Sequence, residues 1–369
     1  MSRIKYKIKQ HAGTVLLCVL SALFMWLGFA NAQNLQKAYP ALSLRYSQAL
    51  PPNAANEARA FIRKNPQQWQ VWPTYWSAEK IKLKTEYNEA EVNALYYDGD
   101  PALVWSAKLI EGIYPGELDD AGIAVSAGLA QALWGSSDVI GQQIWQAEKQ
   151  YTVRGVFEGK QPLALVASFY KEPDGGWKNI ELLPPIKENA TEYANKFATE
   201  SGLGTPDYIV NGKAVASIVS AAAYLPLIVA GVFLLSVLYK KMVRLYKWEK
   251  SIIVWGAFLL VALALPFLLA KLPAWLIPPN WSDFSFWGKT FVEIGDRVVE
   301  WLSLPPSKKD VLAKLMIIGQ VIAVPLACLF GTLTAIKLTK PVNPKEDKQD
   351  LKEDKAQKPL DIEETIKLN

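Results

Sequence analysis

Long runs without charged residues constrain this chain more than any other feature of its sequence. Four segments are apolar over about 20 residues or more, the length that a helix needs to cross the hydrocarbon core of a bilayer. They are residues 13–32, 214–239, 251–270 and 311–336. The last contains one charge, Lys314, whose ammonium can reach the headgroups from the first turn. The sequence therefore predicts an α-helical membrane protein with four transmembrane helices.

Lysine and arginine set the expected orientation, since basic residues accumulate in cytoplasmic loops. The leader, residues 1–12, holds four basic residues and no acid, and residues 240–250 hold five basic residues and one acid. We expect both segments in the cytoplasm of a bacterial cell, together with a disordered tail over residues 337–369 that alternates Lys with Asp and Glu. A large domain over residues 33–213 and the loop 271–310 are then expected outside the cytoplasmic membrane.

The first apolar segment has a second interpretation. It ends in "FANA", where Ala30 and Ala32 match the small-residue pattern of a signal-peptidase site. Cleavage there would leave three spans. The uncharged stretch from Gln10 to Gln36 is longer than a usual signal core, which favours a retained helix, and sequencing of the mature N-terminus distinguishes the two.

Few residues in the chain could perform catalysis or bind a metal. There are two cysteines, Cys18 and Cys328, in separate apolar segments, and one histidine, His11, in the leader. A disulfide framework, a zinc site or a Ser-His-Asp triad needs more than these. A phosphate-binding loop with Gly-Lys-Ser/Thr spacing does not occur in the sequence either. The sequence thus predicts neither an enzyme nor a directly bound cofactor, and it gives no reason to expect a nucleic-acid partner.

Residues 33–213 alternate helix and strand patterns, which predicts a mixed α+β domain between the first two transmembrane helices. Residues 54–64 are typical of a helix, with Asn53 available as its cap. Partial alternation over residues 80–100 predicts paired strands closed by a turn at Asp98-Gly99-Asp100. Three tryptophans, Trp69, Trp72 and Trp76, are interpreted as aromatic core and rim, with a glycan- or peptide-stacking surface as the alternative.

The clearest local pattern follows at residues 122–157. "GIAVS" predicts a short buried strand, Ser126 can cap the next helix, and Gly135 can end it in a left-handed conformation. A hairpin is expected from residues 142–147 and 150–157, with Tyr151, Val153 and Phe157 on one face. Six residues are predicted to define this fold, not to perform chemistry: Ser126, Trp134, Gly135, Ile140, Gly141 and Gly155.

The stretch "GIAVSAGLAQALWGSSDVIGQQIWQAEKQYTVRGVFEG" resembles the periplasmic core domain of MacB/FtsX-like ABC transporter permeases. Members of that family show a strand, a short helix that ends in an aromatic residue or leucine plus glycine, an Asp-(Pro/Val)-Ile-Gly turn, and a strand that ends in Val-x-Gly-Val. The resemblance is specific over roughly residues 90–160, and the order of one span, a large domain and three spans extends it to the whole chain.

The resemblance implies a permease-like, mechanically coupled subunit, in which a separate ATPase moves the membrane helices and the outer domain moves in response. It also implies that the cytoplasmic loop after the second span docks on that ATPase. Here the loop is short and lacks the family's Glu-Ile-Gly, so its basic residues are alternatively topology determinants and lipid contacts. The candidate coupling residues are Lys240, Lys241, Arg244, Lys247, Trp248 and Glu249.

The loop 271–310 contains an amphipathic pattern over residues 284–304. Its apolar positions recur at helical spacing, with Asp283 available as a cap. We expect this helix on the outer leaflet, and packing of its apolar face under the domain is the alternative. The predicted interfacial residues are Trp287, Phe291, Ile294, Val298 and Trp301.

The sequence thus favours a membrane subunit that works with an ABC ATPase and pairs with a second copy or a related permease, with ATP used only through the partner. The alternative is an ATPase-independent, membrane-anchored binding or sensing module that retains the MacB-like domain.

Overall fold

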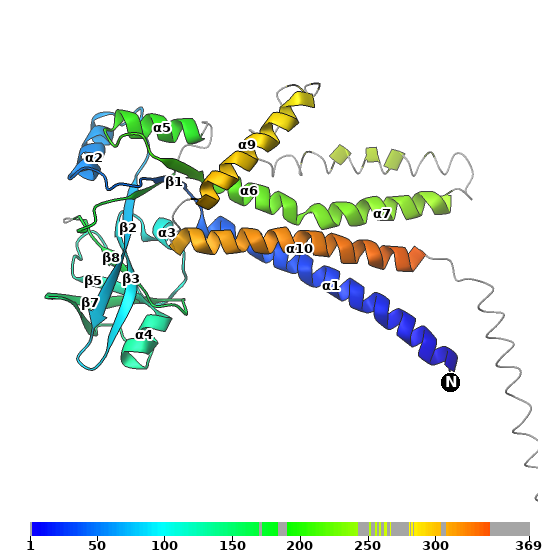
Figure 1. Cartoon of the computed structure of the whole chain (residues 1–369), viewed down its shortest axis with the longest axis horizontal. Coiled ribbons are helices and arrows are strands. Elements are labelled where there is room, and N and C mark those ends of the chain that lie inside the picture. The colour runs from blue at the N-terminus through cyan, green and yellow to red at the C-terminus, as the bar shows by residue number, and fades with distance from the viewer. Residues whose placement is uncertain are drawn as a thin grey trace, which may run out of the picture. The chain divides into compact units, whose positions relative to one another are not determined.

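The computed structural model describes residues 2–169, 172–183, 190–242, 284–303 and 308–339, together with a few positions between 251 and 282 (Figure 1). The described helices are α1 Ser2–Ala38, α2 Ala54–Lys64, α3 Pro101–Val104, α4 Ala127–Trp134, α5 Ala190–Glu200, α6 Gly212–Ala223, α7 Leu225–Met242, α9 Phe284–Ser303 and α10 Lys308–Thr339. The strands are β1 Leu42–Arg45, β2 Thr74–Lys84, β3 Glu89–Asp98, β4 Leu109–Gly112, β5 Gly122–Ser126, β6 Gln143–Gln146, β7 Lys149–Phe157, β8 Leu163–Ala167, β9 Asn179–Leu182 and β10 Tyr208–Asn211.

Three helical segments among the described residues are long and apolar enough to cross a membrane: Ala12–Ala38, Gly212–Phe233 and Lys309–Lys337. They correspond to the first, second and fourth predicted spans. The third, at residues 251–270, lies largely outside the described residues. The chain therefore joins three candidate membrane helices to a mixed α/β domain.

The chain divides into two compact units. The smaller consists of Met1–Phe24, Leu225–Ala257 and Pro325–Asn369, and the larger of Met25–Tyr224 and Phe258–Val324. Within the smaller unit, α1 packs on the last part of α10: the rings of Phe24 and Phe330 stack with centroids 5.8 Å apart, and Ser21 Oγ donates to the Ala327 carbonyl at 3.0 Å.

Two prolines coincide with the unit boundaries. The helix after β10 is interrupted at Tyr224, two residues before Pro226. Proline favours such a break because it has no amide hydrogen and its ring clashes with the preceding turn. Pro325, in contrast, lies inside a continuous α10. Of these two prolines, only Pro226 therefore coincides with an interruption of its helix.

The domain of the larger unit is built on one mixed sheet with the order β10-β1-β9-β2-β3-β8-β5-β7-β4, in which β6 pairs with β2 and β7. Strands β2 and β3 pair antiparallel from Tyr75↔Asp98 to Lys84↔Glu89. Their connection is the turn Thr85–Asn88, where Thr85 N donates to Asn88 O at 2.7 Å. The prediction that Asp98-Gly99-Asp100 closes these strands is wrong. That turn leads into α3 instead, and Asp100 caps α3 by accepting from Ala102 N.

A β-bulge in β7 overturns the predicted face of Phe157. Opposite β5 the register shifts, with Ile123 paired to Val153 but Ala124 paired to Gly155. One extra residue reverses the alternation of side chains beyond it. Tyr151 and Val153 therefore lie in one core cluster and Phe157 in another.

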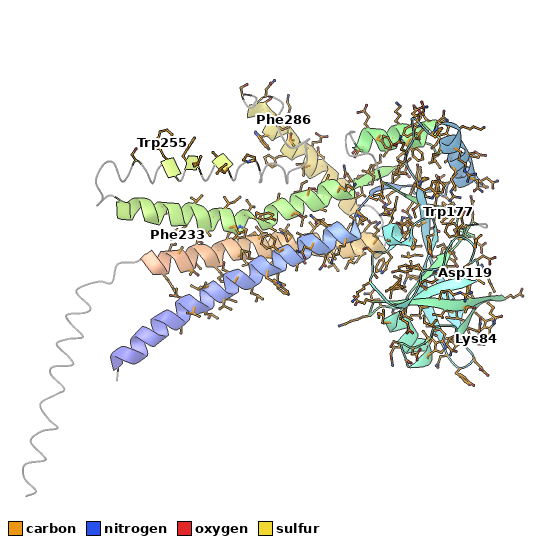
Figure 2. The ribbon with its side chains drawn as sticks, turned by 180° about the vertical axis from the view of Figure 1, so that it is seen from behind. Lys84, Asp119, Trp177, Phe233, Trp255 and Phe286 are labelled. Atoms are coloured by element: carbon orange, nitrogen blue, oxygen red, sulfur yellow. The ribbon has the colours of Figure 1, made fainter. Side chains whose placement is uncertain are left out.

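Apolar residues on the two faces of the sheet form separate cores. Helices α2, α4 and α5 cover the larger core, which includes the fully buried Trp177 (Figure 2). The smaller core contains Trp76, Tyr97 and Phe157. The residues of β1 and β9 also divide by face: Leu44 and Ile180 belong to the larger core, so their polar neighbours point to the opposite side.

Trp69 and Trp76 are 2% and 0% exposed, whereas Trp72 is 60% exposed. Trp69 packs edge-to-face on Tyr193 and Phe197, with centroids 5.1 Å and 5.4 Å away. The interpretation as core and rim thus describes these tryptophans.

Helix α2 has the predicted bounds, but its N-cap Asn53 is left-handed and makes no side-chain capping bond, so that part of the prediction is wrong.

Two of the candidate membrane helices are joined to neighbouring strands of the sheet by very short connections. Helix α1 ends three residues before β1, and α6 begins directly after β10; these two strands pair with each other from Leu42↔Asn211 to Arg45↔Tyr208. A small core joins α1, α6 and the start of α10 at this end, through residues that include Leu35, Val219 and Ala313. In the same region the buried Gln320 donates to the Val219 carbonyl at 3.1 Å. Helices α1, α6 and α10 are therefore packed together next to β1 and β10.

Candidate functional site

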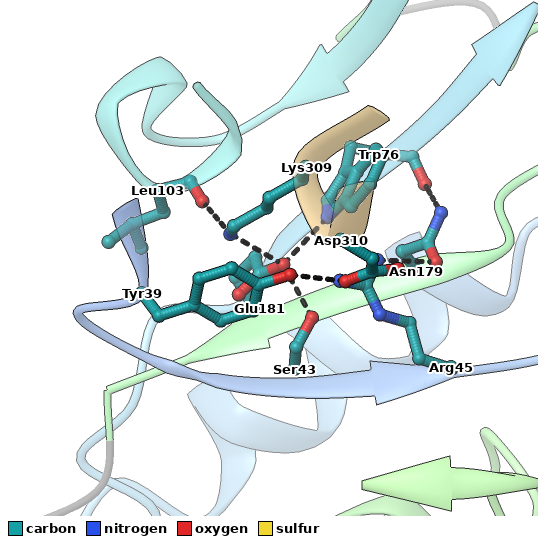
Figure 3. A network of polar contacts seen from close by, with 9 residues as sticks. All are labelled: Tyr39, Ser43, Arg45, Trp76, Leu103, Asn179, Glu181, Lys309 and Asp310. Atoms are coloured by element: carbon teal, nitrogen blue, oxygen red, sulfur yellow. Dashed lines mark hydrogen bonds and ion pairs between the residues drawn. The ribbon is translucent and has the colours of Figure 1, made fainter. Parts of the chain in front are cut away.

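A buried group of polar residues connects the sheet to the first turn of α10 (Figure 3). Strand alternation sends the side chains of β1 and β9 that do not enter the larger core to one face, and the register pairs Ser43 with Glu181 and Arg45 with Asn179. The first turn of α10 supplies the remaining charges over that face. We call this group the junction network; it consists of Tyr39, Ser43, Arg45, Trp76, Leu103, Asn179, Glu181, Lys309 and Asp310.

One half of the junction network is centred on Glu181, whose side chain is fully buried. Lys309 Nζ lies 3.0 Å from Glu181 Oε1 and also donates to the Leu103 carbonyl at 2.5 Å. The same carboxylate oxygen accepts from Ser43 Oγ at 2.5 Å and from Trp76 Nε1 at 2.9 Å. Three donors from three different elements thus converge on one oxygen.

The other half is centred on Asp310. Arg45 Nη2 lies 3.0 Å from Asp310 Oδ1, and the two side chains are 9% and 7% exposed. The hydroxyl of Tyr39, just after α1, donates to the same oxygen. Arg45 Nη1 also donates to Asn179 Oδ1 at 2.8 Å. Asp310 therefore ties α10 both to β1 and to the end of α1.

Burial and neighbouring charges together shift the pKa values of Tyr39 and Arg45. Desolvation raises the pKa of Tyr39 well above its ordinary value, and the charge of Asp310 raises it further, so the hydroxyl remains a donor. Burial by itself lowers the pKa of Arg45, but the charges of Asp310 and Glu181 outweigh it and the net shift is upward. The Arg45 guanidinium also lies 4.8 Å from the centroid of the Trp76 ring. The Arg45 guanidinium therefore stays charged beside Asp310.

The junction network is not completely satisfied. Among the described residues, Glu181 Oε2 and Arg45 Nε are buried without a hydrogen-bond partner. A buried polar atom in that state costs about 1–3 kcal/mol. The network thus combines two ion pairs with two polar atoms that have no hydrogen-bond partner.

These contacts connect α10 to the sheet by matched charges. Each acid is matched by a base, and the described residues contain no group of three or more His, Cys, Asp or Glu that could hold a metal. Buried ion pairs add little net stability, but they fix which elements stay together, since removing one partner leaves an unpaired charge. The site holds the start of α10 to the sheet at two points.

Sequence reasoning missed the junction network. Alternation in "LSLR" and "NIEL" is what a strand with one face in water also shows, so it gave no reason to bury Arg45 or Glu181. The one available signal was the pair Lys309-Asp310 directly before a membrane span, where capping alone does not need both charges.

The predicted site residues have different outcomes. Lys240 and Lys241 lie in the last turn of α7, and the rest of the candidate coupling loop lies outside the described residues. In α9, Trp287 and Ile294 are half-buried, Phe291 and Val298 are exposed, and the side chain of Trp301 lies outside the described residues.

The predicted fold-defining residues lie around α4 and the β6–β7 hairpin. Ser126 and Gly135 are the N-cap and the left-handed C-cap of α4, Gly141 is left-handed, and Trp134 packs on the larger core. A Cβ on Gly155 would lie 2.4 Å from the Ile113 carbonyl oxygen, so only glycine fits there. Ile140 is 38% exposed, and its neighbour Val139 occupies the core instead.

We expect Ser126→Ala to lower the free energy of unfolding by about 1–3 kcal/mol, because Ser126 does more than cap α4. Its hydroxyl accepts from Leu129 N and Leu163 N and donates to the Gln161 carbonyl, so one atom joins α4 to β8. Denaturant unfolding of the chain in detergent measures the loss. Ser136→Ala, on the exposed turn after α4, is the matched control and should leave the unfolding midpoint unchanged. An equal effect of the two substitutions would contradict the capping role.

Two acidic residues of the domain, Asp98 and Asp119, form ion pairs. Asp98 is 3% exposed and forms an ion pair with Arg59 of α2; burial raises its pKa, and Arg59 opposes the shift. Asp119 lies 2.7 Å from Arg154 at the surface. These pairs join neighbouring elements of the domain.

Comparisons with known proteins give matches only by structure. No family model matches the sequence, and no curated protein does. The periplasmic region of MacB from Actinobacillus actinomycetemcomitans is 14% identical, covers 48% of this chain and 91% of that chain, and superposes with a TM-score of 0.39. The extracellular domain of the ABC-type transporter YknZ from Gram-positive bacteria is 12% identical, with 46% and 97% covered and a TM-score of 0.36.

A third structure, a domain of a permease protein from Porphyromonas gingivalis, is 20% identical, with 45% of this chain and 84% of that chain covered and a TM-score of 0.32. The three structures are thus named as parts of MacB, of an ABC-type transporter and of a permease protein. The likeness to each of the three covers about half of this chain, at 12–20% identity.

Proposed function

We propose that this chain is a permease-like membrane subunit of a bacterial ABC transport system. A separate cytoplasmic ATPase would move its helices, and the mixed α/β domain would respond on the other side of the membrane. The chain itself would bind no nucleotide and would act as a dimer with a second copy or a related permease.

The observation that carries this proposal is the junction network. A subunit that transmits motion needs a firm connection between its membrane helices and its domain. At the start of α10, Lys309 forms a buried ion pair with Glu181 of β9, and Asp310 forms one with Arg45 of β1. Helix α1 is followed after three residues by β1, α6 directly follows β10, and β1 and β10 pair with each other. Movement of any of these three helices would therefore pull on one end of the sheet.

The unsatisfied atoms of the junction network support a moving connection. Glu181 Oε2 and Arg45 Nε could both gain partners if α10 shifted by a small distance relative to β1 and β9. A second arrangement of similar energy would then be available, as a two-state coupling element requires.

Co-purification tests the proposal at its cytoplasmic end. Affinity-tagged full-length chain, expressed in its native host and extracted in mild detergent, should retain an ATP-binding cassette subunit. The double charge reversal Arg244→Glu/Lys247→Glu should reduce the recovered ATPase several-fold, because a basic docking loop loses its attraction for an acidic partner surface and gains repulsion.

The matched control is Arg63→Glu/Lys64→Glu, which reverses an equivalent pair of charges on the exposed end of α2 in the domain. It should leave ATPase recovery unchanged. If no ATPase co-purifies with the unaltered chain, or if both double variants behave alike, the coupled permease is wrong. The membrane-anchored binding or sensing module would then take its place.

A further inference from the structure

Helix α9 carries its charges on a single narrow arc. At 100° per residue, the five charged positions of this 20-residue helix fall within about 100° of one another around the axis. They are Lys289, Glu293, Asp296, Arg297 and Glu300. The rest of the circumference is apolar or small.

One flank of the apolar surface is packed within the protein. Thr290 is 8% exposed, and Trp287 and Ile294 are half-buried. The Trp287 ring contacts those of Phe286 and Phe291, with centroids 5.6 Å and 6.3 Å away. The predicted interfacial face is thus divided, and part of it is used for contacts within the molecule.

The other flank is open. Phe291, Val292 and Val299 are 64%, 65% and 67% exposed, and Val298 is 45% exposed. Between them lie Gly288 and Gly295, where an added Cβ would meet no atom within 4 Å. We call these six residues the open strip of α9. Four large apolar side chains exposed side by side on one helix are unusual for a surface that faces water.

The place of α9 in the chain indicates what covers the open strip. Only residues 304–307 separate α9 from α10, and a chain of that length spans at most about 18 Å. The candidate membrane segment of α10 is Lys309–Lys337, and residues 311–336 within it hold one charge, Lys314. In the first turns of that span, Val311 and Leu315 are 42% and 60% exposed, so an apolar surface suited to lipid begins close to the end of α9.

Composition agrees with a bilayer surface as the partner. Phe286, Trp287 and Phe291 form an aromatic cluster near the start of α9, and aromatic side chains concentrate at the level of the headgroups. The charged arc holds two bases and three acids, so attraction to anionic lipid does not contribute. Binding would depend on apolar contact alone.

We propose that α9 lies on the outer leaflet through its open strip, with Val292 and Val299 immersed among the acyl chains and the charged arc in water. The flank at Thr290 and Trp287 is the one turned into the protein. This assignment does not depend on an ATPase partner.

Spin labelling of the full-length chain in phosphatidylcholine nanodiscs tests the assignment. Cys18→Ser and Cys328→Ser remove the native thiols, and Val292→Cys and Val299→Cys place labels at two independent positions of the open strip. Both labels should be several-fold more accessible to oxygen, and less accessible to an aqueous nickel chelate, than labels at Lys289→Cys and Glu293→Cys on the charged arc. Including phosphatidylglycerol should not change the result.

Two outcomes would overturn the assignment. Equal nickel accessibility at Val292→Cys, Val299→Cys and Lys289→Cys would place the open strip in water. Labels at Val292 and Val299 that are shielded from both oxygen and nickel would show that protein, such as a second copy of the chain, covers the strip.

Discussion

Lys309→Met should lower the free energy of unfolding of the domain by about 3–5 kcal/mol, the largest loss that we expect from a single change of charge. Removing the ammonium leaves the carboxylate of Glu181 buried, with Ser43 and Trp76 as its remaining donors. Denaturant unfolding of the full chain in detergent, followed by tryptophan fluorescence, measures the change. The control is Lys82→Met, which breaks a pair of the same type with Glu89 at 2.7 Å, exposed on the surface; it should not shift the midpoint.

A double-mutant cycle isolates the contact itself. Glu181→Gln retains an acceptor for Ser43 and Trp76 but leaves Lys309 without its counter-charge, so it should also destabilise. The double variant Lys309→Met/Glu181→Gln should lose less than the sum of the two single variants, by about 0.5–3 kcal/mol. Strict additivity would show that the two side chains do not interact.

The same double variant separates stability from transmission. It removes one of the two ties between α10 and the sheet without leaving a lone buried charge. If the proposed function is right, it should still recover the ATPase, but ATP should no longer alter the conformation of the domain. A domain response as large as that of the unaltered chain would remove the junction network from the mechanism.

Trp69→Ala should cost about 3–5 kcal/mol in unfolding free energy, because the indole fills the space between α2 and α5. Its ring contacts those of Phe61, Tyr193 and Phe197, all within 6.4 Å between centroids. Trp72→Ala, three residues further along the same segment but 60% exposed, is the matched control. Comparable losses in the two variants, measured by denaturant unfolding, would contradict the assignment of Trp69 to the core.

Trp72 also bears on the alternative of a stacking surface. A platform for sugar rings or peptides requires several aromatic faces open on one side. Of the three tryptophans only Trp72 is open, since Trp69 belongs to the larger core and Trp76 to the junction network. The described tryptophans of this segment therefore offer one exposed ring and not a platform.

Local patterns were predictable wherever neighbours in sequence decide the outcome. The strand "GIAVS", the cap at Ser126, the stop at Gly135 and the hairpin that follows depend on residues within one or two turns. The bulge that redirects Phe157 was not predictable. It arises because β5 and β7 must share a register with neighbours on both sides, and that requirement is absent from the alternation of β7 alone.

By itself the sequence predicted the membrane helices, because uncharged runs of some 20 residues have the length and composition that a bilayer span requires. It also predicted the mixed domain, the strand β5 with the capped helix α4, and the resemblance that these carry. Only the tertiary structure decided that four charged side chains are buried as two ion pairs: Arg45, Glu181, Lys309 and Asp310. A charged side chain is stable in water or beside an opposite charge, and the choice depends on which distant segment arrives at that face of the sheet. Residues 265 positions apart, Arg45 and Asp310, meet here, and no local pattern encodes that contact.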